Sequence, residues 1–460
     1  MKHTRSLRSR WPSVALVLAC TCAWAAEARL ASQIRAQDPG VRAGAAAAGA
    51  PLDGLSAGQR EYFTRGQEDF AEAEGLADGL GPRMNLDSCG GCHSQPAIGG
   101  SSPAVNPQFA FATLNGGRDS VPPFITADGP VREARFVRNA DGTADGGVHA
   151  LFTLTGRLGD TACTATQPDF AAAMASHNVI FRIPTPTFGT GLIEQIPDAA
   201  LLANQASQAS LKHALGIRGR PNFHVAGRAI TGQTNNNGND GTIARFGWKA
   251  QNKSLLLFSG EAYNVEMGIS NELFPTERDE TSTCQYGTRP NSISNSEATS
   301  AVDAMSSIEL FSHFMRLLAP PTPSTTMPGG AVSITNGKRL FASVGCAFCH
   351  TPRFTTGPAA IAALANRTVD LYSDLLIHDM GVGLADGISQ GEAGPREFRT
   401  APLWGLGQRI FFLHDGRTSN LLSAIRAHAS SGSEANGVVS NFGALSEGQK
   451  QDLLNFLRSL

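Results

Sequence analysis

The stretch Cys89-Gly90-Gly91-Cys92-His93 decides the fold of this chain, and Cys346-Ala347-Phe348-Cys349-His350 repeats its pattern. C-x-x-C-H is the attachment signature of c-type haem, in which two thiols bond the porphyrin and the histidine ligates the iron. One turn of helix brings both sulfurs to one edge of the macrocycle. The sequence therefore predicts two covalently bound haem c groups, with His93 and His350 as proximal ligands. A pair of zinc or redox-active C-x-x-C sites is the alternative.

The first residues have the features of a secretory signal peptide. Basic residues begin the chain, an apolar run extends from Val14 to Trp24, and Ala23-Trp24-Ala25 is a small-residue cleavage site. We therefore predict a signal peptide over residues 1–26 and a soluble protein that is periplasmic or otherwise exported. No later apolar run approaches the ~18 residues of a membrane span. A lipoprotein anchor at Cys20 is the alternative.

The balance of charged residues and the number of cysteines limit the kinds of partner and of covalent bond that this protein can have. The 37 basic and 39 acidic residues nearly cancel, which argues against nucleic acid or a membrane surface as a partner. Of the eight cysteines, two leave with the signal peptide and four belong to the haem motifs. Cys163 and Cys284 remain, and in an oxidising compartment they predict a disulfide. Two unrelated buried thiols are the alternative.

The remaining sequence divides into two unequal parts. A low-complexity run (VRAGAAAAGA, 41–50) predicts a disordered leader over residues 27–55. Residues 56–318 are predicted as an N-terminal haem domain, 319–330 (APPTPSTTMPGG) as a linker, and 331–460 as a C-terminal domain like a class I cytochrome c. Helices are predicted over 56–70, 306–318 and 335–344, the second from its apolar spacing, and a capping-box pattern at Ser446 predicts a further helix after it.

The two parts echo one another outside the haem motifs. Phe181-Arg182-Ile183-Pro184 is answered by FRTAP at 398–402, and Phe246-Gly247-Trp248 by FLH at 412–414. The echo favours two related domains over a chance likeness of glycine- and proline-rich loops. The predicted fold is therefore mainly α and loop-rich, with two cytochrome c-like haem domains, the first enlarged by insertions.

Several stretches resemble the bacterial dihaem cytochrome c peroxidase superfamily, and most closely its exported branch of dihaem oxidoreductases, also described as thiol oxidoreductases. They are RFGWKAQNKSLL, NVEMG, LIHDMGVGLADG, REFRTAPLWGLG and FFLHDGRTSNLLSAIRAH. The resemblance spans about residues 56–460. It implies that the N-terminal haem reacts with peroxide and that the C-terminal haem receives electrons.

The resemblance also implies roles for single residues. Trp248 matches the tryptophan between the haems, Glu266 the distal acid over the reactive haem, and His428 the distal ligand of the electron-transfer haem. A carboxyl group in a haem pocket suits proton transfer during O–O cleavage, because burial raises its pKa. Tyr263 is a second catalytic candidate. Phe258 stands where the family has a distal glutamine.

The sixth ligand of the second haem has alternatives. Met380 is the first, since thioether ligation is common in small cytochromes c, and His378 and His414 are weaker ones. Arg245 and Lys249, beside Trp248, are candidates to pair with haem propionates. For the first haem no histidine follows the motif closely, and His149, His177 and His224 are weak candidates.

Family members also hold calcium between the haems, so calcium is a further candidate cofactor. Thr400 and Pro402 fall near the expected backbone ligands, but Arg182 stands at the partner position in the first half.

The sequence thus predicts an exported dihaem oxidoreductase that reduces hydrogen peroxide. Electrons from a small redox protein would pass from the C-terminal to the N-terminal haem. One alternative is a non-catalytic electron-transfer cytochrome. Another is a dihaem oxidase of a thiol, a protein side chain or an organic substrate.

Overall fold

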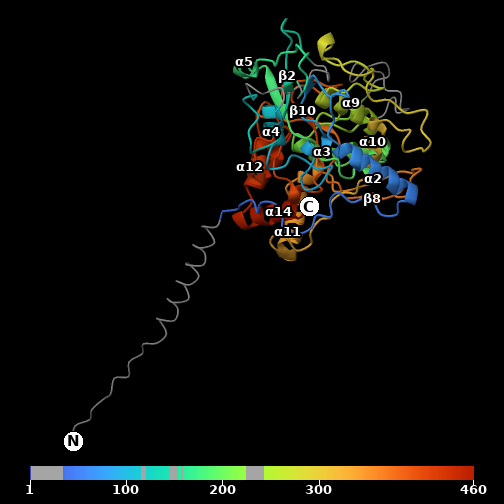
Figure 1. Cartoon of the computed structure of the whole chain (residues 1–460). Coiled ribbons are helices and arrows are strands. Elements are labelled where there is room, and N and C mark those ends of the chain that lie inside the picture. The colour runs from blue at the N-terminus through green and yellow to red at the C-terminus, as the bar shows by residue number, and fades with distance from the viewer. Residues whose placement is uncertain (2–34, 115–120, 146–153, 157–158, 224–242) are drawn as a thin grey trace.

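The computed structural model describes residues 1, 35–114, 121–145, 154–156, 159–223 and 243–460. It is mainly helical and rich in loops, as predicted (Figure 1). The predicted signal peptide, with Cys20, lies outside the described residues, as do His149 and His224. In the described ranges, no helix has both the length and the apolar character to cross a bilayer.

Three helices surround the first haem motif, which itself forms α3 (Cys89–Cys92). They are α2 (Ala57–Ala71), α9 (Leu255–Met267) and α10 (Ser307–Leu317). Capping boxes at Ser56 and Ser306 begin α2 and α10, because the serine side chain and the third helical residue satisfy each other's free backbone donors. Phe63, Phe70 and Phe314 pack between α2 and α10. These helices fix the position of the motif.

The second haem motif lies beside a different helix pair. The motif begins η3 (Cys346–Phe348), directly after α11 (Gly330–Ser343), and α14 (Glu447–Ser459) packs across α11. A Cβ atom on Gly337 would lie 2.0 Å from the Asp452 carbonyl oxygen, so glycine is required for this close approach. Ser446 caps α14 with a third capping box, as the sequence predicts.

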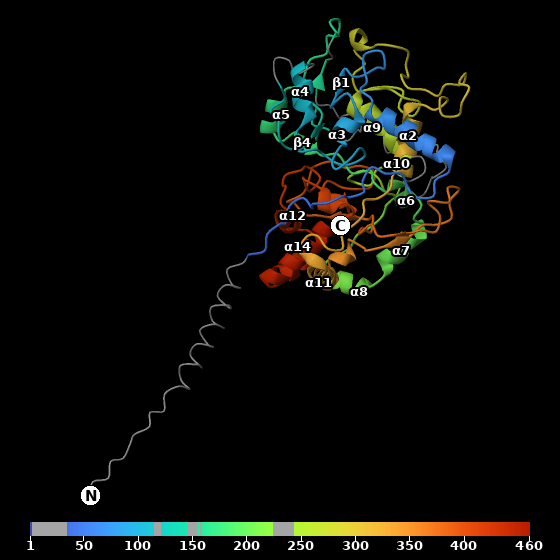
Figure 2. The ribbon, with the colours of Figure 1, turned by 60° about the horizontal axis from the view of Figure 1, so that its bottom comes forward.

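The predicted N-terminal and C-terminal parts are not separate in space, because residues that precede the predicted linker pack against the second haem motif's surroundings. In Figure 2, α8 (Ala209–Ala214) lies beside α11 and α7 (Asp198–Ala206) lies beyond α8, although residues 198–214 precede the predicted linker. The Asn204 side chain donates to Thr351 Oγ1 at 3.0 Å, and the Arg218 amide donates to Glu434 at 2.8 Å. Part of the predicted N-terminal domain therefore contacts the second haem motif.

Residues 35–55 differ from the predicted disordered leader. The Arg42 amide donates to the Gly407 carbonyl and the Leu52 amide to Leu317. Asp38 forms a buried ion pair with Arg458 at 2.7 Å. The low-complexity composition of this segment hides these anchors, because each partner lies hundreds of residues away. The segment bridges both parts of the molecule.

The remaining elements are short. The helices are α4 (Pro107–Leu114), α5 (Phe170–Ala175), α6 (Thr190–Glu194), α12 (Leu421–Ala427), α13 (Asn436–Gly443), η2 (Ser282–Cys284) and η4 (Leu406–Gln408). The strands form two-stranded antiparallel ladders: β1 (Arg83–Met84) with β3 (Leu154–Thr155), β2 (Glu133–Phe136) with β4 (Val179–Arg182), β5 (Asn222–Phe223) with β6 (Ile243–Ala244), β7 (Phe354–Thr355) with β8 (Thr368–Val369), and β9 (Ile377–Asp379) with β10 (Glu397–Arg399).

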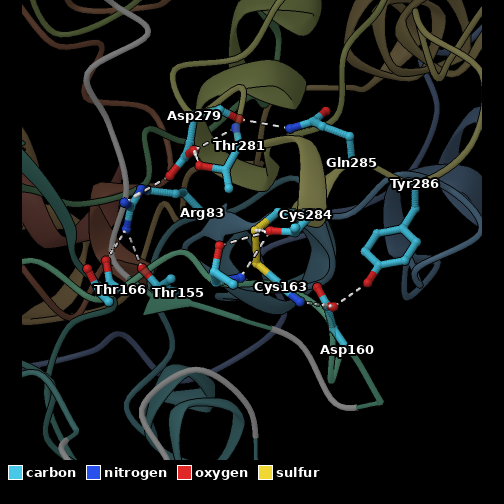
Figure 3. Close-up of a disulfide and its surroundings, with 12 residues drawn as sticks. Arg83, Thr155, Asp160, Cys163, Thr166, Asp279, Thr281, Cys284, Gln285 and Tyr286 are labelled. Atoms are coloured by element: carbon cyan, nitrogen blue, oxygen red, sulfur yellow. Dashed lines mark hydrogen bonds and ion pairs between the residues drawn. A yellow bond between two sulfur atoms is a disulfide. The ribbon is translucent and has the colours of Figure 1, made fainter.

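Cys163 and Cys284, the pair predicted from the sequence, form a disulfide in the structure (Figure 3). They are 121 residues apart. Beside them, Arg83 forms an ion pair with Asp279 at 2.9 Å. This covalent bond ties the long insertion after the first motif to the segment that follows α9.

Replacing both Cys163 and Cys284 by serine should lower the free energy of unfolding by roughly 2–5 kcal/mol, because the bond restricts a long loop of the unfolded chain. Denaturant unfolding of the haem-loaded protein measures this. An unchanged midpoint would contradict a structural role for the bond. Reduction by dithiothreitol should destabilise the native protein and leave the double variant unaffected.

Candidate functional site

Two cavities adjoin the two motifs. Cavity 1 is lined by the motif residues Cys89, Cys92 and His93 together with one side of α9. Cavity 2 is lined by the motif residues Cys346, Cys349 and His350 together with α12. Each predicted haem motif therefore faces a hollow in the protein.

The motif histidines are oriented as iron ligands require. His93 Nδ1 lies 2.9 Å from the Gly100 carbonyl oxygen, and His350 Nδ1 lies 3.0 Å from the Tyr372 carbonyl oxygen. A proton on Nδ1, donated to the carbonyl, leaves the lone pair on Nε2 for a metal. Burial lowers the pKa of each ring to about 4, so both are neutral.

The motif cysteines take no part in a disulfide, so their sulfurs are available for attachment of haem. Burial raises the pKa of Cys89 and Cys92 well above the ordinary value, and that of Cys346 to about 12. A redox-active C-x-x-C site depends on a thiolate with a lowered pKa. The environment of these thiols therefore disfavours the redox alternative.

Trp248 lies between the cavities and lines both of them. Its indole Nε1 donates to the Ile183 carbonyl at 2.9 Å, and its ring lies 6.4 Å from that of His414. A smaller third cavity also includes Trp248, together with Trp404 and Arg409. The structure thus places one aromatic side chain against both predicted haem sites.

Carboxyl groups gather in cavity 1. Glu261 and Glu266 lie on α9, and Glu133 comes from β2. Glu266 and Glu133 are hydrogen-bonded to each other. Burial, followed by the charges of Glu133 and Glu261, raises the pKa of Glu266 well above its usual range; burial also raises the pKa of Glu133. Two carboxyl groups in such contact share a proton, because both cannot ionise in a desolvated site.

Glu133 is a site residue that the sequence reasoning missed. It lies 133 residues before Glu266, and β2 brings it into the cavity through its antiparallel pairing with β4. Arg135, two residues later on β2, also lines the cavity, and a period of two puts both side chains on one face of the strand. Charged residues at every second position of a predicted strand, here Glu133 and Arg135, were the signal in the sequence that could have indicated this part of the site.

Tyr263 and Phe258 line cavity 1 as well. The Tyr263 hydroxyl donates to Glu74 Oε1 at 2.7 Å, so its polar end is held by a residue outside the cavity lining. Phe258 stacks on Phe246 at 6.2 Å. Among the described residues, His93 is the only histidine that lines cavity 1, and His177 is exposed elsewhere.

Cavity 2 contains four candidates for a sixth ligand: His378, Met380, His414 and His428. His428 ends α12, and its Nδ1 lies 2.8 Å from the Ala424 carbonyl oxygen, the arrangement seen at both motif histidines. Burial lowers its pKa, so the ring is neutral. His414 stacks on Phe398 at 4.4 Å. The geometry favours His428.

His378 is held by carboxylates on both sides. Its Nδ1 lies 2.8 Å from Glu434 and its Nε2 lies 2.9 Å from Asp374. Cys349, Asp374 and His378 together form a group that could hold a metal ion in the described part of the chain. Because both ring nitrogens of His378 are hydrogen-bonded to carboxylates, a role as haem ligand is not favoured. Because Cys349 is a predicted haem thiol, a zinc site at this group is not favoured either.

Comparison with known proteins identifies a family for most of the chain. A family described as "Di-haem oxidoreductase, putative peroxidase" matches residues 134–460. The chain belongs to the di-haem oxidoreductase family. None of the curated proteins matches it. Among solved structures, Kuenenia stuttgartiensis hydrazine synthase, pressurised with 20 bar xenon, is similar at a TM-score of 0.22 and 18% identity; the match covers 35% of this chain and 56% of that one.

A di-haem oxidoreductase must also accommodate the anionic propionates of its haems. Arg399 and Arg409 face cavity 2 and the smaller cavity beside Trp248. Burial lowers the pKa of each to about 10, and among the described residues neither forms an ion pair. Two adjacent guanidinium groups without a carboxylate partner fit propionates. The predicted candidates Arg245 and Lys249 line neither haem cavity and are bonded elsewhere.

Calcium fits this di-haem oxidoreductase poorly at the expected partner position. The buried Arg182 guanidinium forms an ion pair with Asp386 at 2.6 Å, and the Lys249 ammonium pairs with the same carboxylate at 3.0 Å. Lys249 also donates to the carbonyls of Gly394 and Glu397. Two side-chain cations therefore already surround the anion, and a divalent cation there would be repelled.

Proposed function

We propose that this di-haem oxidoreductase reduces hydrogen peroxide in cavity 1 with electrons that enter at cavity 2. The observation that carries the proposal is Trp248, which lines both cavities and so offers a path between them. The unlike surroundings of the two motifs support the direction of transfer. Cavity 2 offers a second neutral histidine, whereas cavity 1 offers carboxyl groups.

The carboxyl pair supports proton transfer in cavity 1. A bound haem would supply the iron that binds peroxide and the electrons that reduce it. Glu266, sharing a proton with Glu133, can take a proton from the near oxygen and return one to the far oxygen. A protein that only carries electrons needs no such pair, so this feature favours an enzyme over an electron-transfer cytochrome.

Export and an external electron donor belong to the same proposal. A disulfide between Cys163 and Cys284 is stable where the surroundings are oxidising, as in the periplasm. Attachment of haem c through all four motif thiols is proposed with it. A small redox protein would give electrons to the haem in cavity 2, with His350 and His428 as its two ligands.

Replacing Trp248 by leucine tests the proposed path. In protein that has been half-reduced so that only haem 2 is ferrous, the variant should oxidise haem 2 more slowly after peroxide is added, because the aromatic bridge is lost. Stopped-flow absorbance of the ferrous band measures this.

Trp404→Leu is the matched control. Trp404 lines the smaller cavity but neither haem cavity, so its loss should leave the rate near that of the native protein. Equal rates for the native protein and the Trp248 variant would contradict transfer through this side chain. Absence of peroxide turnover by half-reduced native protein would overturn the proposed function itself.

A further inference from the structure

Tyr263 joins cavity 1 to a buried acidic group outside it. Its ring lines the cavity and only 3% of the residue is exposed, but its hydroxyl donates to Glu74 Oε1 at 2.7 Å. Glu74 lies between α2 and α3 and does not line the cavity. A proton leaving the phenol would therefore move away from the peroxide site rather than into it.

Glu74 is suited to accept that proton. Burial is the main effect that raises its pKa, to about 7, and the nearby acids Asp78, Asp69 and Glu72 add to it, while the bond from Tyr263 opposes it. The Ser307 side chain, at the start of α10, lies near both Tyr263 and Asp69 and lowers the pKa of each. A base whose pKa lies near neutrality can gain and release a proton without a large energetic penalty.

Aromatic side chains connect Tyr263 with the proximal histidine. The ring centroids of Tyr263 and Phe311 are 5.1 Å apart, those of Phe311 and Phe70 are 5.8 Å apart, and Phe70 lies 5.8 Å from the ring of His93. All four rings line cavity 1. Tyr263 is thus in contact with the predicted haem site both directly and through its neighbours.

We propose that Tyr263 is a redox-active side chain that gives one electron to cavity 1 while passing its phenolic proton to Glu74. The proposal rests on the proposed function, which supplies hydrogen peroxide as the oxidant. Such a step would let the fully oxidised protein reduce peroxide before any electron arrives from cavity 2.

The electrons and protons of this step balance. Reduction of one hydrogen peroxide to two water molecules breaks the O–O bond and consumes two electrons and two protons. Tyr263 supplies one electron and becomes a neutral phenoxyl radical; the O–H bond breaks, and the proton converts the Glu74 carboxylate to the acid. A haem held by His93 would supply the other electron. The two protons consumed come from solvent through Glu266 and Glu133.

The other tyrosines provide controls, because the chain has four in all. Tyr286 also donates its hydroxyl to a carboxylate, that of Asp160, but it lies beside the disulfide and lines neither haem cavity (Figure 3). The backbone carbonyl of Tyr372 accepts the hydrogen bond from His350 Nδ1, next to cavity 2. Tyr62 stacks on His313 between α2 and α10.

Freeze-quench EPR of the fully oxidised holoprotein, mixed with hydrogen peroxide, tests the proposal. A radical should appear whose hyperfine pattern changes when ring-deuterated tyrosine is incorporated. It should be absent from Tyr263→Phe, which keeps the ring packing, and present in Tyr286→Phe and Tyr372→Phe. Glu74→Gln should reduce its yield, because the proton acceptor is lost.

The outcomes separate this proposal from the function on which it rests. If peroxide changes the haem spectrum but no tyrosyl radical forms, or if the radical persists in Tyr263→Phe, the relay is wrong and peroxide reduction stands. If peroxide leaves the haem spectrum unchanged in both the oxidised and the half-reduced protein, the proposed function fails. Flash oxidation by a ruthenium polypyridyl complex then decides the relay, and equal radical yields with and without Tyr263 overturn it.

Discussion

Replacing Glu266 by glutamine should lower kcat/KM for hydrogen peroxide by about 10²- to 10⁴-fold, the usual contribution of a positioned acid–base group. Glutamine keeps the size of the side chain but cannot take a proton from the near oxygen of peroxide. Glu133→Gln should lower the same constant, because Glu266 then loses the partner with which it shares a proton. Steady-state turnover with a reduced electron donor measures both.

Glu272→Gln is the control for this prediction. Glu272 follows α9 by a few residues and is exposed, so the same chemical change should leave turnover intact. Native rates in Glu266→Gln would contradict the acid assignment. The haem spectrum and the melting temperature of each variant show whether a lost rate reflects chemistry or loss of structure.

The carboxyl pair also predicts a pH dependence of stability. Because folding raises the pKa of both Glu133 and Glu266, the folded protein binds these protons more tightly than the unfolded chain does. Stability should therefore fall as pH rises from the ordinary carboxyl pKa of about 4.3 toward the raised values. Glu266→Gln removes part of this effect. The melting temperature of the variant, relative to that of the native protein, should therefore increase as pH rises.

Replacing His428 by alanine should convert haem 2 from low-spin to high-spin and allow it to bind cyanide. His428 is the neutral, backbone-oriented histidine of cavity 2, so its loss leaves the iron with His350 alone. His428→Met should raise the reduction potential of haem 2, since His/Met ligation lies at higher potential than bis-histidine ligation. EPR and a spectroelectrochemical titration measure these changes.

Met380→Leu is the matched control for haem 2. The Met380 side chain also lines cavity 2, and its backbone amide is bonded to the Arg396 carbonyl, so leucine should keep the local fold. Haem 2 should remain low-spin in this variant. The reverse pattern, with a high-spin haem in Met380→Leu and none in His428→Ala, would assign the methionine as the ligand.

Local patterns in the sequence predicted the features that depend on nearby residues. Each haem motif lies within five residues, and the capping box predicted at Ser446 spans four, so spacing alone reveals them. The resemblance to known dihaem proteins indicated Trp248, and the structure places it beside both cavities.

Features that depend on distant residues could not be predicted in this way. Glu133 meets Glu266 only because β2 pairs with β4, and Arg409 faces cavity 2 only through its tertiary position. Residues 198–214 contact the second motif across more than a hundred residues of chain. The anchoring of Arg42 by Gly407 likewise leaves no local signal in an alanine- and glycine-rich segment.

The most direct test of the central claim is an optical and EPR titration of the oxidised and half-reduced holoprotein with cyanide and peroxide. The account predicts two unlike haems. The haem at His93 should be high-spin, or become so on half-reduction, and bind cyanide, while the haem at His350 stays low-spin. Two haems that both remain low-spin and inert in every redox state would contradict it, and the protein would then be an electron-transfer cytochrome.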